Sequence, residues 1–286
     1  MNTLQLNPDK TGLSTACEIL QNGGVVAIPT ETVYGLAANA YDETAIAKIF
    51  EAKGRPQDNP LIVHIASIDT LYELASTVPK TALKCAEKFW PGPLTMVLPK
   101  TEKVPNAVSA GLSTVAVRMP LNQTARDIIE KSGLPLAAPS ANISGSPSPT
   151  TAQHVLNDMN GKIDAVVDGG ECSVGVESTV VTLVTTPPTL LRPGGITPEQ
   201  LEDVLGEIQI SPAVFEKLKE KNLDSKLILQ VHDELIVECP PAEAEKVKAA
   251  NVTPTVGPVK PTPSGKNGKI MGKRNTRLRY AKMQKP

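Results

Sequence analysis

Four loops of the sequence combine glycine or proline with side chains that can bind an anion. Lys53 and Arg55 flank a glycine and precede a proline, and Arg192 precedes Pro-Gly-Gly. The other two loops are the polar segments 29–36 and 139–148. Glycine lets the backbone approach a ligand, and guanidinium groups bind phosphate or carboxylate oxygens through paired donors. An ordinary surface turn explains one such loop, but four of them near the ends of predicted strands favour a ligand site there.

Familiar motifs of nucleotide and hydrolase sites are missing from the sequence. There is no GxxxxGK[ST] loop and no GxGxxG after the first predicted strand. No GxSxG surrounds a serine, so Ser140 is not predicted to be a hydrolase nucleophile. His64 lies in an apolar run, where a core histidine with one hydrogen bond is the simpler interpretation. The four cysteines form no CxxC pair, which argues against a structural zinc site.

Short apolar runs alternate with segments of helical periodicity over the first 205 residues. The alternation predicts an α/β fold, a twisted mixed sheet with flanking helices, in which short connections require some antiparallel pairs. The predicted strands are residues 25–28, 61–65, 94–98, 114–117, 135–138, 163–167, 178–184 and 189–191. The predicted helices are residues 13–20, 42–54, two stretches around Pro79 that end near Trp90, 122–133, 152–159 and one that begins at the capping box Thr197–Gln200.

The composition is that of a globular protein with a small-residue core. Of the 286 residues, 40% are hydrophobic but only 3% are aromatic, so Val, Ile, Leu and Ala must fill the interior. No apolar run approaches the roughly 20 residues of a membrane span. The opening residues MNTLQLNPDK lack the pattern of a signal peptide. We therefore expect a soluble, reduced, cytoplasmic protein without a membrane partner.

The net charge of −1 conceals a basic segment at the end of the sequence. Residues 251–286 contain nine Lys or Arg and no Asp or Glu, with five prolines among them. Such a stretch cannot bury enough apolar surface to fold, so it is predicted to be a disordered basic tail. A second interpretation is an arm that binds nucleic acid through phosphate neutralisation.

Seven ordered motifs carry a resemblance to a known family. They are PTETVYGLAANA, KGRPQDNPLIVHI, WPGPLT, TVAVRMP, APSANISG, GVESTVV and LLRPG. Together they closely resemble the threonylcarbamoyl-AMP synthase family, also called the Sua5/YrdC/YciO family, over residues 13–210. The resemblance implies a YrdC-like sheet around a large cationic groove. It also implies that L-threonine, bicarbonate and ATP react to give threonylcarbamoyl-adenylate and pyrophosphate.

The resemblance also implies roles for particular residues. Lys53 and Arg55 are the expected catalytic residues and hold the ATP phosphates. The remaining ATP-binding residues are expected to be Asn59, Thr114, Ser140, Asn142, Ser148 and Arg192. The expected threonine-binding residues are Thr30, His64, Arg118 and Ser178. Mg²⁺ is expected to arrive with ATP, without dedicated protein ligands. Glu31 is a candidate for a water-bridged metal contact or an amine contact, or has a structural role in its loop.

The implied reaction needs no protein nucleophile. The N-carboxylate of threonine would attack the α-phosphorus of ATP, so catalysis would be positioning and charge stabilisation. A downstream tRNA threonylcarbamoyl transferase would then make N6-threonylcarbamoyladenosine at position 37 of tRNA (t6A37). Three alternatives remain: a binding module of this fold for double-stranded RNA or tRNA, a carbamoyl-transfer relative, and a nonfunctional fusion product.

The chain departs from the family after residue 208. We divide it into a YrdC-like domain (1–208), a linker and fragment (209–250) and the basic tail (251–286). The Lys-Tyr-x-His-Tyr-x-Pro type motif expected in the linker is missing. Residues 215–248 instead resemble the motif C region of family A DNA polymerases, with Asp233 at the metal-binding position. The second aspartate and the fingers domain are missing, so polymerase activity is not expected. A hairpin over 227–237 and a helix over 241–250 are predicted there.

Overall fold

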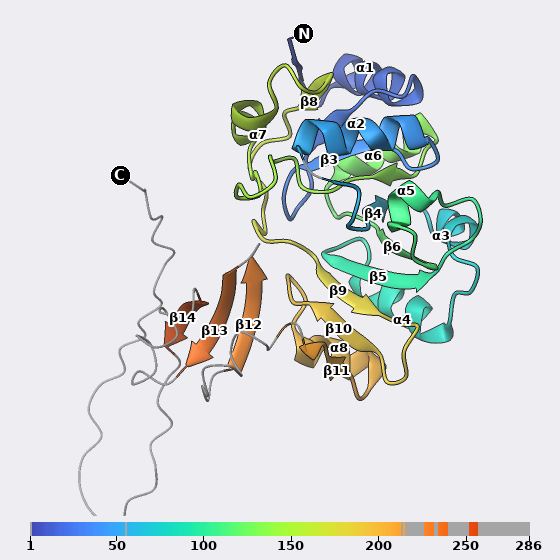
Figure 1. The fold of residues 1–286 in the computed structure, drawn as a ribbon, viewed down its shortest axis with the longest axis vertical. Coiled ribbons are helices and arrows are strands. Elements are labelled where there is room, and N and C mark those ends of the chain that lie inside the picture. Colours follow the sequence, from blue (N-terminus) through green and yellow to red (C-terminus); the bar gives the residue numbers. More distant parts are fainter. Residues whose placement is uncertain are drawn as a thin grey trace, which may run out of the picture.

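The computed structural model describes residues 2–54, 56–212 and 214, and the backbone of residues 226–231, 234–239 and 252–256 (Figure 1). Its helices are α1 (Lys10–Gln21), α2 (Glu43–Lys53), α3 (Ile68–Leu74), α4 (Lys80–Phe89), α5 (Asn106–Ser109), α6 (Gln123–Ser132), α7 (Ala152–Met159) and α8 (Pro198–Leu205). Its strands are β1 (Leu4–Leu6), β2 (Val26–Ile28), β3 (Gly35–Asn39), β4 (Ile62–His64), β5 (Leu94–Pro99), β6 (Thr114–Arg118), β7 (Leu136–Ala137), β8 (Ala165–Val167), β9 (Thr179–Thr182), β10 (Thr189–Arg192), β11 (Gln209–Ile210), β12 (Lys226–Val231), β13 (Glu234–Cys239) and β14 (Val252–Val256).

Strands β1 to β11 form one mixed sheet in the order β1-β8-β2-β3-β7-β4-β6-β5-β9-β10-β11. Hairpin partners such as β2 and β3, or β9 and β10, run antiparallel. Pairs that are distant in sequence, such as β4 with β6 and β5 with β9, run parallel. The predicted α/β class and the mixed character of the sheet are therefore confirmed.

Apolar side chains on the two faces of the sheet enter two separate cores. Along β2, Val26 and Ile28 pack with helices α1 and α6, whereas Ala27 belongs to the larger core. That larger core contains the buried faces of α2, α3, α4, α7 and α8. Successive strand residues point to opposite faces, so a continuous apolar run such as 25–28 indicates a strand covered on both sides.

Helix boundaries follow the capping signals of the sequence. Asp42 Oδ1 accepts hydrogen bonds from the backbone N–H groups of Thr44 and Ala45 at the start of α2. Gly54 ends the same helix with a left-handed φ of 63°. The capping box of Thr197 and Gln200 is present at the start of α8. The predicted boundaries are therefore confirmed where a side chain or a left-handed residue caps the helix.

Strand β3 was not predicted, because residues 29–36 read as a loop. Its Gly-Leu-Ala-Ala-Asn sequence has no β-branched residue, and pairing with β2 and β7 places it in the sheet. Gly35 leaves room for the neighbouring strand, since a Cβ at this position would lie only 3.2 Å from the Cβ of Ala138.

Strands β12, β13 and β14 form a separate three-stranded sheet in the order of the chain. β12 and β13 pair antiparallel, which confirms the hairpin predicted over 227–237. β14 begins where the disordered tail was predicted, because Val252, Thr253, Thr255 and Val256 favour a strand. Pro254 is compatible with this edge position. The helix predicted over 241–250 and the rest of the tail, 257–286, lie outside the described residues.

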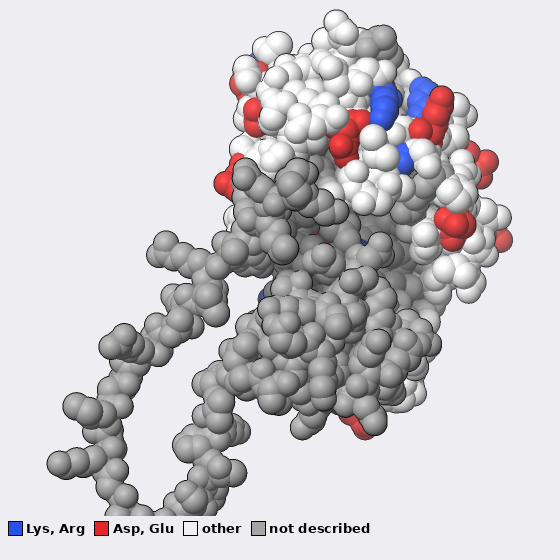
Figure 2. Space-filling model, turned by 60° about the vertical axis from the view of Figure 1, so that its left-hand side comes forward, with Lys and Arg blue, Asp and Glu red and all other residues white. Residues whose placement is uncertain are grey.

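Charged side chains do not segregate on the part of the surface whose residues are coloured by type in Figure 2. Lys and Arg are intermingled with Asp and Glu there, and neither kind forms a single patch. Among the residues that the structure describes, no helix is both long enough and apolar enough to cross a membrane.

Candidate active site on the open face of the sheet

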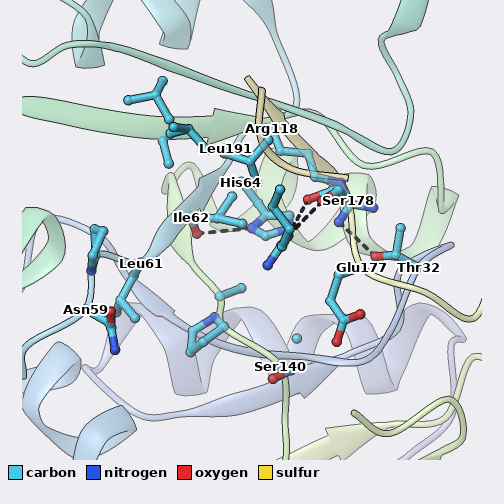
Figure 3. A pocket seen from close by; sticks show the side chains of 18 of the residues that line it. Thr32, Asn59, Leu61, Ile62, His64, Arg118, Ser140, Glu177, Ser178 and Leu191 are labelled. Carbon is cyan, nitrogen blue, oxygen red and sulfur yellow. Dashed lines mark hydrogen bonds between the residues drawn. The ribbon is translucent and has the colours of Figure 1, made fainter. Parts of the chain in front are cut away.

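A cavity of about 670 Å³ lies against the face of β4, β5, β6 and β9 (Figure 3). Alternate residues of the strands line it: Thr114, Ala116 and Arg118 of β6 face the cavity, while Val115 and Val117 enter the core. The polar loops of the sequence predict a site beyond the strand ends. Instead, the cavity also extends over the sheet surface, because the helices of the larger core pack on the opposite side.

Eight of the predicted site residues line this one cavity. They are Thr30, Asn59, His64, Thr114, Arg118, Ser140, Ser178 and Arg192. Three others, Lys53, Asn142 and Ser148, are not among the lining residues. Arg55 lies outside the described residues. Segments separated by more than 150 positions in the chain therefore meet around one space.

Lys53 is the last residue of α2, and its side chain is buried. Its Nζ donates to the carbonyl oxygens of Ser140 at 2.5 Å and Asn142 at 2.8 Å. The side-chain amide of Asn142 in turn donates to the carbonyls of Ile143 and Ser146. These contacts fix the 140–146 loop, whose Ser140 lines the cavity. Lys53 thus supports the cavity wall in the observed arrangement.

Arg192, at the end of β10, is held by neutral acceptors. Its Nε and Nη2 donate to the carbonyl oxygen of Ser178 at 3.0 and 2.8 Å, and Nη2 also donates to Ser178 Oγ. Ser178 Oγ lies 2.7 Å from Thr95 Oγ1. Burial lowers the pKa of Arg192 to about 10, with Glu177 opposing and Arg118 adding to this shift. The guanidinium therefore remains a cation at neutral pH.

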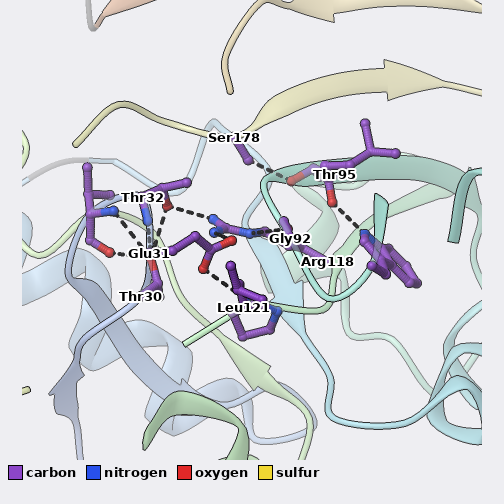
Figure 4. A network of polar contacts seen from close by, with 12 residues as sticks. Thr30, Glu31, Thr32, Gly92, Thr95, Arg118, Leu121 and Ser178 are labelled. Atoms are coloured by element: carbon purple, nitrogen blue, oxygen red, sulfur yellow. Dashed lines mark hydrogen bonds and ion pairs between the residues drawn. The ribbon is translucent and has the colours of Figure 1, made fainter. Parts of the chain in front are cut away.

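Arg118, at the end of β6, is fixed on three sides (Figure 4). Its Nη2 lies 2.7 Å from Glu31 Oε1, its Nη1 donates to Thr32 Oγ1 at 2.8 Å, and its Nε donates to the carbonyl of Gly92 at 3.3 Å. The other carboxylate oxygen of Glu31 accepts the backbone N–H of Leu121. Of the roles that the sequence left open for Glu31, the structure supports the structural one.

His64 belongs to both the strand and the cavity. Its Nδ1 lies 3.3 Å from the carbonyl oxygen of Ile62, as expected for a core histidine with one hydrogen bond. The ring nevertheless lines the cavity. Burial, and to a lesser degree Arg118, lowers the pKa of His64 to about 3. His64 is therefore a neutral hydrogen-bonding group at physiological pH.

Thr30 shapes the turn between β2 and β3. Its Oγ1 donates to the carbonyl of Val33 at 2.6 Å and accepts the backbone N–H groups of Thr32 and Val33. The hydroxyl thus closes a side-chain turn that presents the Thr30 and Thr32 side chains to the cavity.

Sequence reasoning missed Glu177 and the apolar part of the lining. Glu177 lines the cavity, and its Oε1 accepts a hydrogen bond from Ser148 Oγ at 2.7 Å. Val97 and Val180 form part of the apolar wall. The period of two along β6 could have revealed that this face of the sheet is open, because polar and small residues alternate there with buried valines.

The Pro-Gly-Gly segment after Arg192 packs directly on the cavity wall. A Cβ at Gly194 would lie 2.4 Å from both the Glu177 carbonyl oxygen and the Thr179 backbone nitrogen. Only glycine permits this approach, which sets the position of Glu177 and Ser178.

The fold and the cavity belong to a defined class. Residues 18–194 match the model of the Sua5_yciO_yrdC family, which carries the description "Telomere recombination". The chain therefore belongs to the Sua5/YciO/YrdC family. Within it, the chain is 59% identical over 202 residues to a threonylcarbamoyl-AMP synthase of Pyrococcus abyssi, covering 71% of this chain and 59% of the relative. It is 50% identical over 216 residues to a threonylcarbamoyl-AMP synthase of Bacillus subtilis, covering 75% and 62%.

Solved structures agree with this assignment. The structure of P. abyssi Sua5 complexed with L-threonine matches with a TM-score of 0.73 and 54% identity, covering 75% of this chain and 64% of that one. Escherichia coli YciO, at 23% identity and a TM-score of 0.62, shares the fold. The chain spans about three fifths of the length of the two curated relatives above, 59% and 62%.

Proposed function

We propose that the chain is a threonylcarbamoyl-AMP synthase, which converts L-threonine, bicarbonate and ATP to threonylcarbamoyl-adenylate and pyrophosphate. The observation that carries the proposal is the convergence of eight predicted ligand-binding residues on one cavity. The names of the relatives, and the L-threonine bound to the P. abyssi structure, support it. Because the chain covers only part of those relatives, the activity is tested on this chain itself.

The cavity offers binding and orientation rather than covalent chemistry. In the proposed reaction, the N-carboxylate of threonine attacks the α-phosphorus of ATP, and pyrophosphate leaves. Arg192 supplies a partly buried cation for the phosphates, and Arg118 supplies donors for the amino-acid carboxylate. Neutral His64 can hydrogen-bond the amino acid without adding charge. Holding the two reactants side by side accounts for the rate enhancement.

Mg²⁺ would accompany ATP and neutralise charge on its phosphates. No cluster of three His, Cys, Asp or Glu side chains occurs within the described part of the chain. Among the lining residues that the structure describes, Glu177 supplies the one carboxylate. A single carboxylate together with substrate phosphates suits Mg²⁺, which retains several of its waters. Glu177 is therefore the residue that would hold the ion.

The experiment is incubation of the full chain with ATP, bicarbonate and labelled L-threonine, followed by detection of the labile adenylate and of pyrophosphate. We expect both products, with no product when bicarbonate or threonine is omitted. A chain ending at residue 214, which keeps all of β1 to β11, is assayed in parallel to test whether later residues contribute. ATP hydrolysis that is independent of threonine would contradict the proposal.

The proposed product also indicates a partner enzyme and a location in the cell. A labile adenylate must be consumed nearby, so we propose a downstream tRNA threonylcarbamoyl transferase as partner and the cytoplasm as location. The nine cations of residues 251–286 favour a second candidate, a module that binds double-stranded RNA or tRNA. Salt-sensitive RNA retention in a gel, without ATP turnover, would favour that candidate.

We propose no polymerase activity for residues 215–248. The likeness to motif C remains an interpretation of sequence, and Asp233 lies outside the described residues. The carbamoyl-transfer alternative is tested by replacing threonine and bicarbonate with carbamoyl phosphate in the same assay. If the full chain aggregates and the chain ending at residue 214 stays in solution, the result would support the alternative of a nonfunctional fusion product.

A further inference from the structure

The two arginines of the cavity differ in how their charge is balanced. Arg118 has a carboxylate oxygen of Glu31 at 2.7 Å. Arg192 donates to the carbonyl and hydroxyl oxygens of Ser178 and forms no ion pair with any residue that the structure describes. One guanidinium therefore touches a carboxylate, whereas the other has a carboxylate, that of Glu177, only elsewhere in the same cavity.

The counter-charge on Arg118 is fixed. The Glu31 side chain is 2% exposed, and its second oxygen is held by the Leu121 N–H at 2.9 Å. The backbone carbonyl of Glu31 accepts the N–H of Val174 at 2.7 Å. Glu31 therefore cannot rotate away from Arg118 when a ligand arrives without breaking a buried hydrogen bond.

Arg118 nevertheless keeps donors for a ligand. Its guanidinium has five N–H groups, of which Nε is used by Gly92 and one at Nη1 by Thr32. The side chain lines the cavity (Figure 3). Arg118 can thus hydrogen-bond a ligand carboxylate, although the Glu31–Arg118 ion pair has no net charge.

We propose that Glu31 determines which anion binds at Arg118: it neutralises the guanidinium so that this end of the cavity accepts a zwitterionic amino acid and rejects phosphate. The inference rests on the proposed function, because it assigns the amino acid to Arg118 and the phosphates to Arg192. A zwitterion brings no net charge, so the Glu31–Arg118 pair does not repel it. A phosphate dianion gains no net attraction from a neutral pair and is repelled by the Glu31 carboxylate, whereas the Arg192 guanidinium is in direct contact with neutral acceptors only.

The competing explanation is that Glu31 only holds Arg118 in place. Charge and placement are separated by two substitutions. Glu31→Gln keeps the size and removes the charge, whereas Glu31→Asp keeps the charge and shortens the side chain. Glu73→Gln is the control, since Glu73 pairs with Lys103 at the surface, with the two side chains 52% and 62% exposed.

The test measures L-threonine binding to the full chain by titration calorimetry, without ATP, at increasing inorganic phosphate. Sodium chloride keeps the ionic strength constant. In the wild type and in Glu73→Gln, phosphate should leave the apparent Kd for threonine unchanged. In Glu31→Gln, phosphate should compete with threonine and bind about tenfold more tightly or better, because one buried unit charge has been removed. Glu31→Asp should resist phosphate as the wild type does.

Each outcome either supports or overturns the proposed role of Glu31. Competition by phosphate in the wild type overturns the inference and requires no variant, so the test survives if Glu31→Gln fails to fold. Equal sensitivity of Glu31→Gln and Glu31→Asp overturns it as well, in favour of placement alone. A wild type that does not bind threonine overturns the proposed function together with the inference. A wild type that binds threonine, with a Glu31→Gln variant that ignores phosphate, overturns the inference alone.

Discussion

Replacing Lys53 by methionine tests whether this residue acts through the loop that it holds. Methionine has a similar length but no donor, so the carbonyls of Ser140 and Asn142 lose hydrogen bonds of 2.5 and 2.8 Å. Charge-assisted bonds contribute about 1.5–3 kcal/mol each, and relief from burying the ammonium offsets part of the loss. We therefore expect the free energy of unfolding to fall by about 3 kcal/mol. In a domain of this size that lowers Tm by about 6–12 °C.

Lys48→Met is the matched control on the same helix. Lys48 is exposed and makes one hydrogen bond, to the carbonyl of Gly23 at 2.7 Å, so its loss should change stability by less than about 1 kcal/mol. Thermal melting and urea unfolding measure both variants, and adenylate formation is assayed alongside. Suppose Lys53→Met melts with Lys48→Met while turnover is lost. Lys53 would then act on the ligand directly, and the loop-support reasoning would be refuted.

Three further substitutions test the site. Folding lowers the pKa of His64 from 6.5 to about 3. Between these two pH values the unfolded state binds a proton that the folded state does not bind. The free energy of unfolding should therefore fall as the pH drops from 6.5 towards 3, by up to about 1.4 kcal/mol per pH unit. His64→Gln should remove that slope from pH-dependent urea melts, whereas replacing exposed His154 should not. Gly194→Ala should lower stability by at least about 2 kcal/mol, because its Cβ meets backbone atoms at 2.4 Å; a normal melting temperature would contradict this. Arg118→Gln should raise the Kd for threonine by about 10- to 100-fold in calorimetry while ATP binding persists, and unchanged affinity would remove Arg118 from the site.

The sequence was most informative where a local signal is strong. Caps such as Asp42 and Gly54 mark helix ends by a single side chain or a left-handed residue, so those boundaries were predictable. β3 was not, because its alanine-rich residues become a strand only through pairing with β2 and β7. A short segment with weak β-propensity gives no local signal of the strands with which it will pair.

For the site as well, the sequence predicts which residues take part but not their long-range contacts. The family motifs identified eight residues that do line the cavity, but a motif does not say which atom a side chain contacts. Lys53 was expected at the phosphates, and the structure directs its ammonium to loop carbonyls. The pairing of Glu31 with Arg118 joins residues 87 positions apart, which no spacing rule reveals. The open sheet face could have been found, since the alternation along β6 was visible in the sequence.

The pairing of β1 with β8 bears on how the chain is made. Leu4 to Leu6 align with Ala165 to Val167, and Thr3 Oγ1 donates to the Ile163 carbonyl, 160 positions later. During translation, the first strand therefore emerges long before its partner β8 exists. One edge of β2 also stays unpaired until β8 has been made, because β2 pairs with β8 as well. Until roughly residue 170 has left the ribosome, the backbone hydrogen-bonding groups that pair with β8 stay unpaired, which exposes the nascent sheet to non-native pairing.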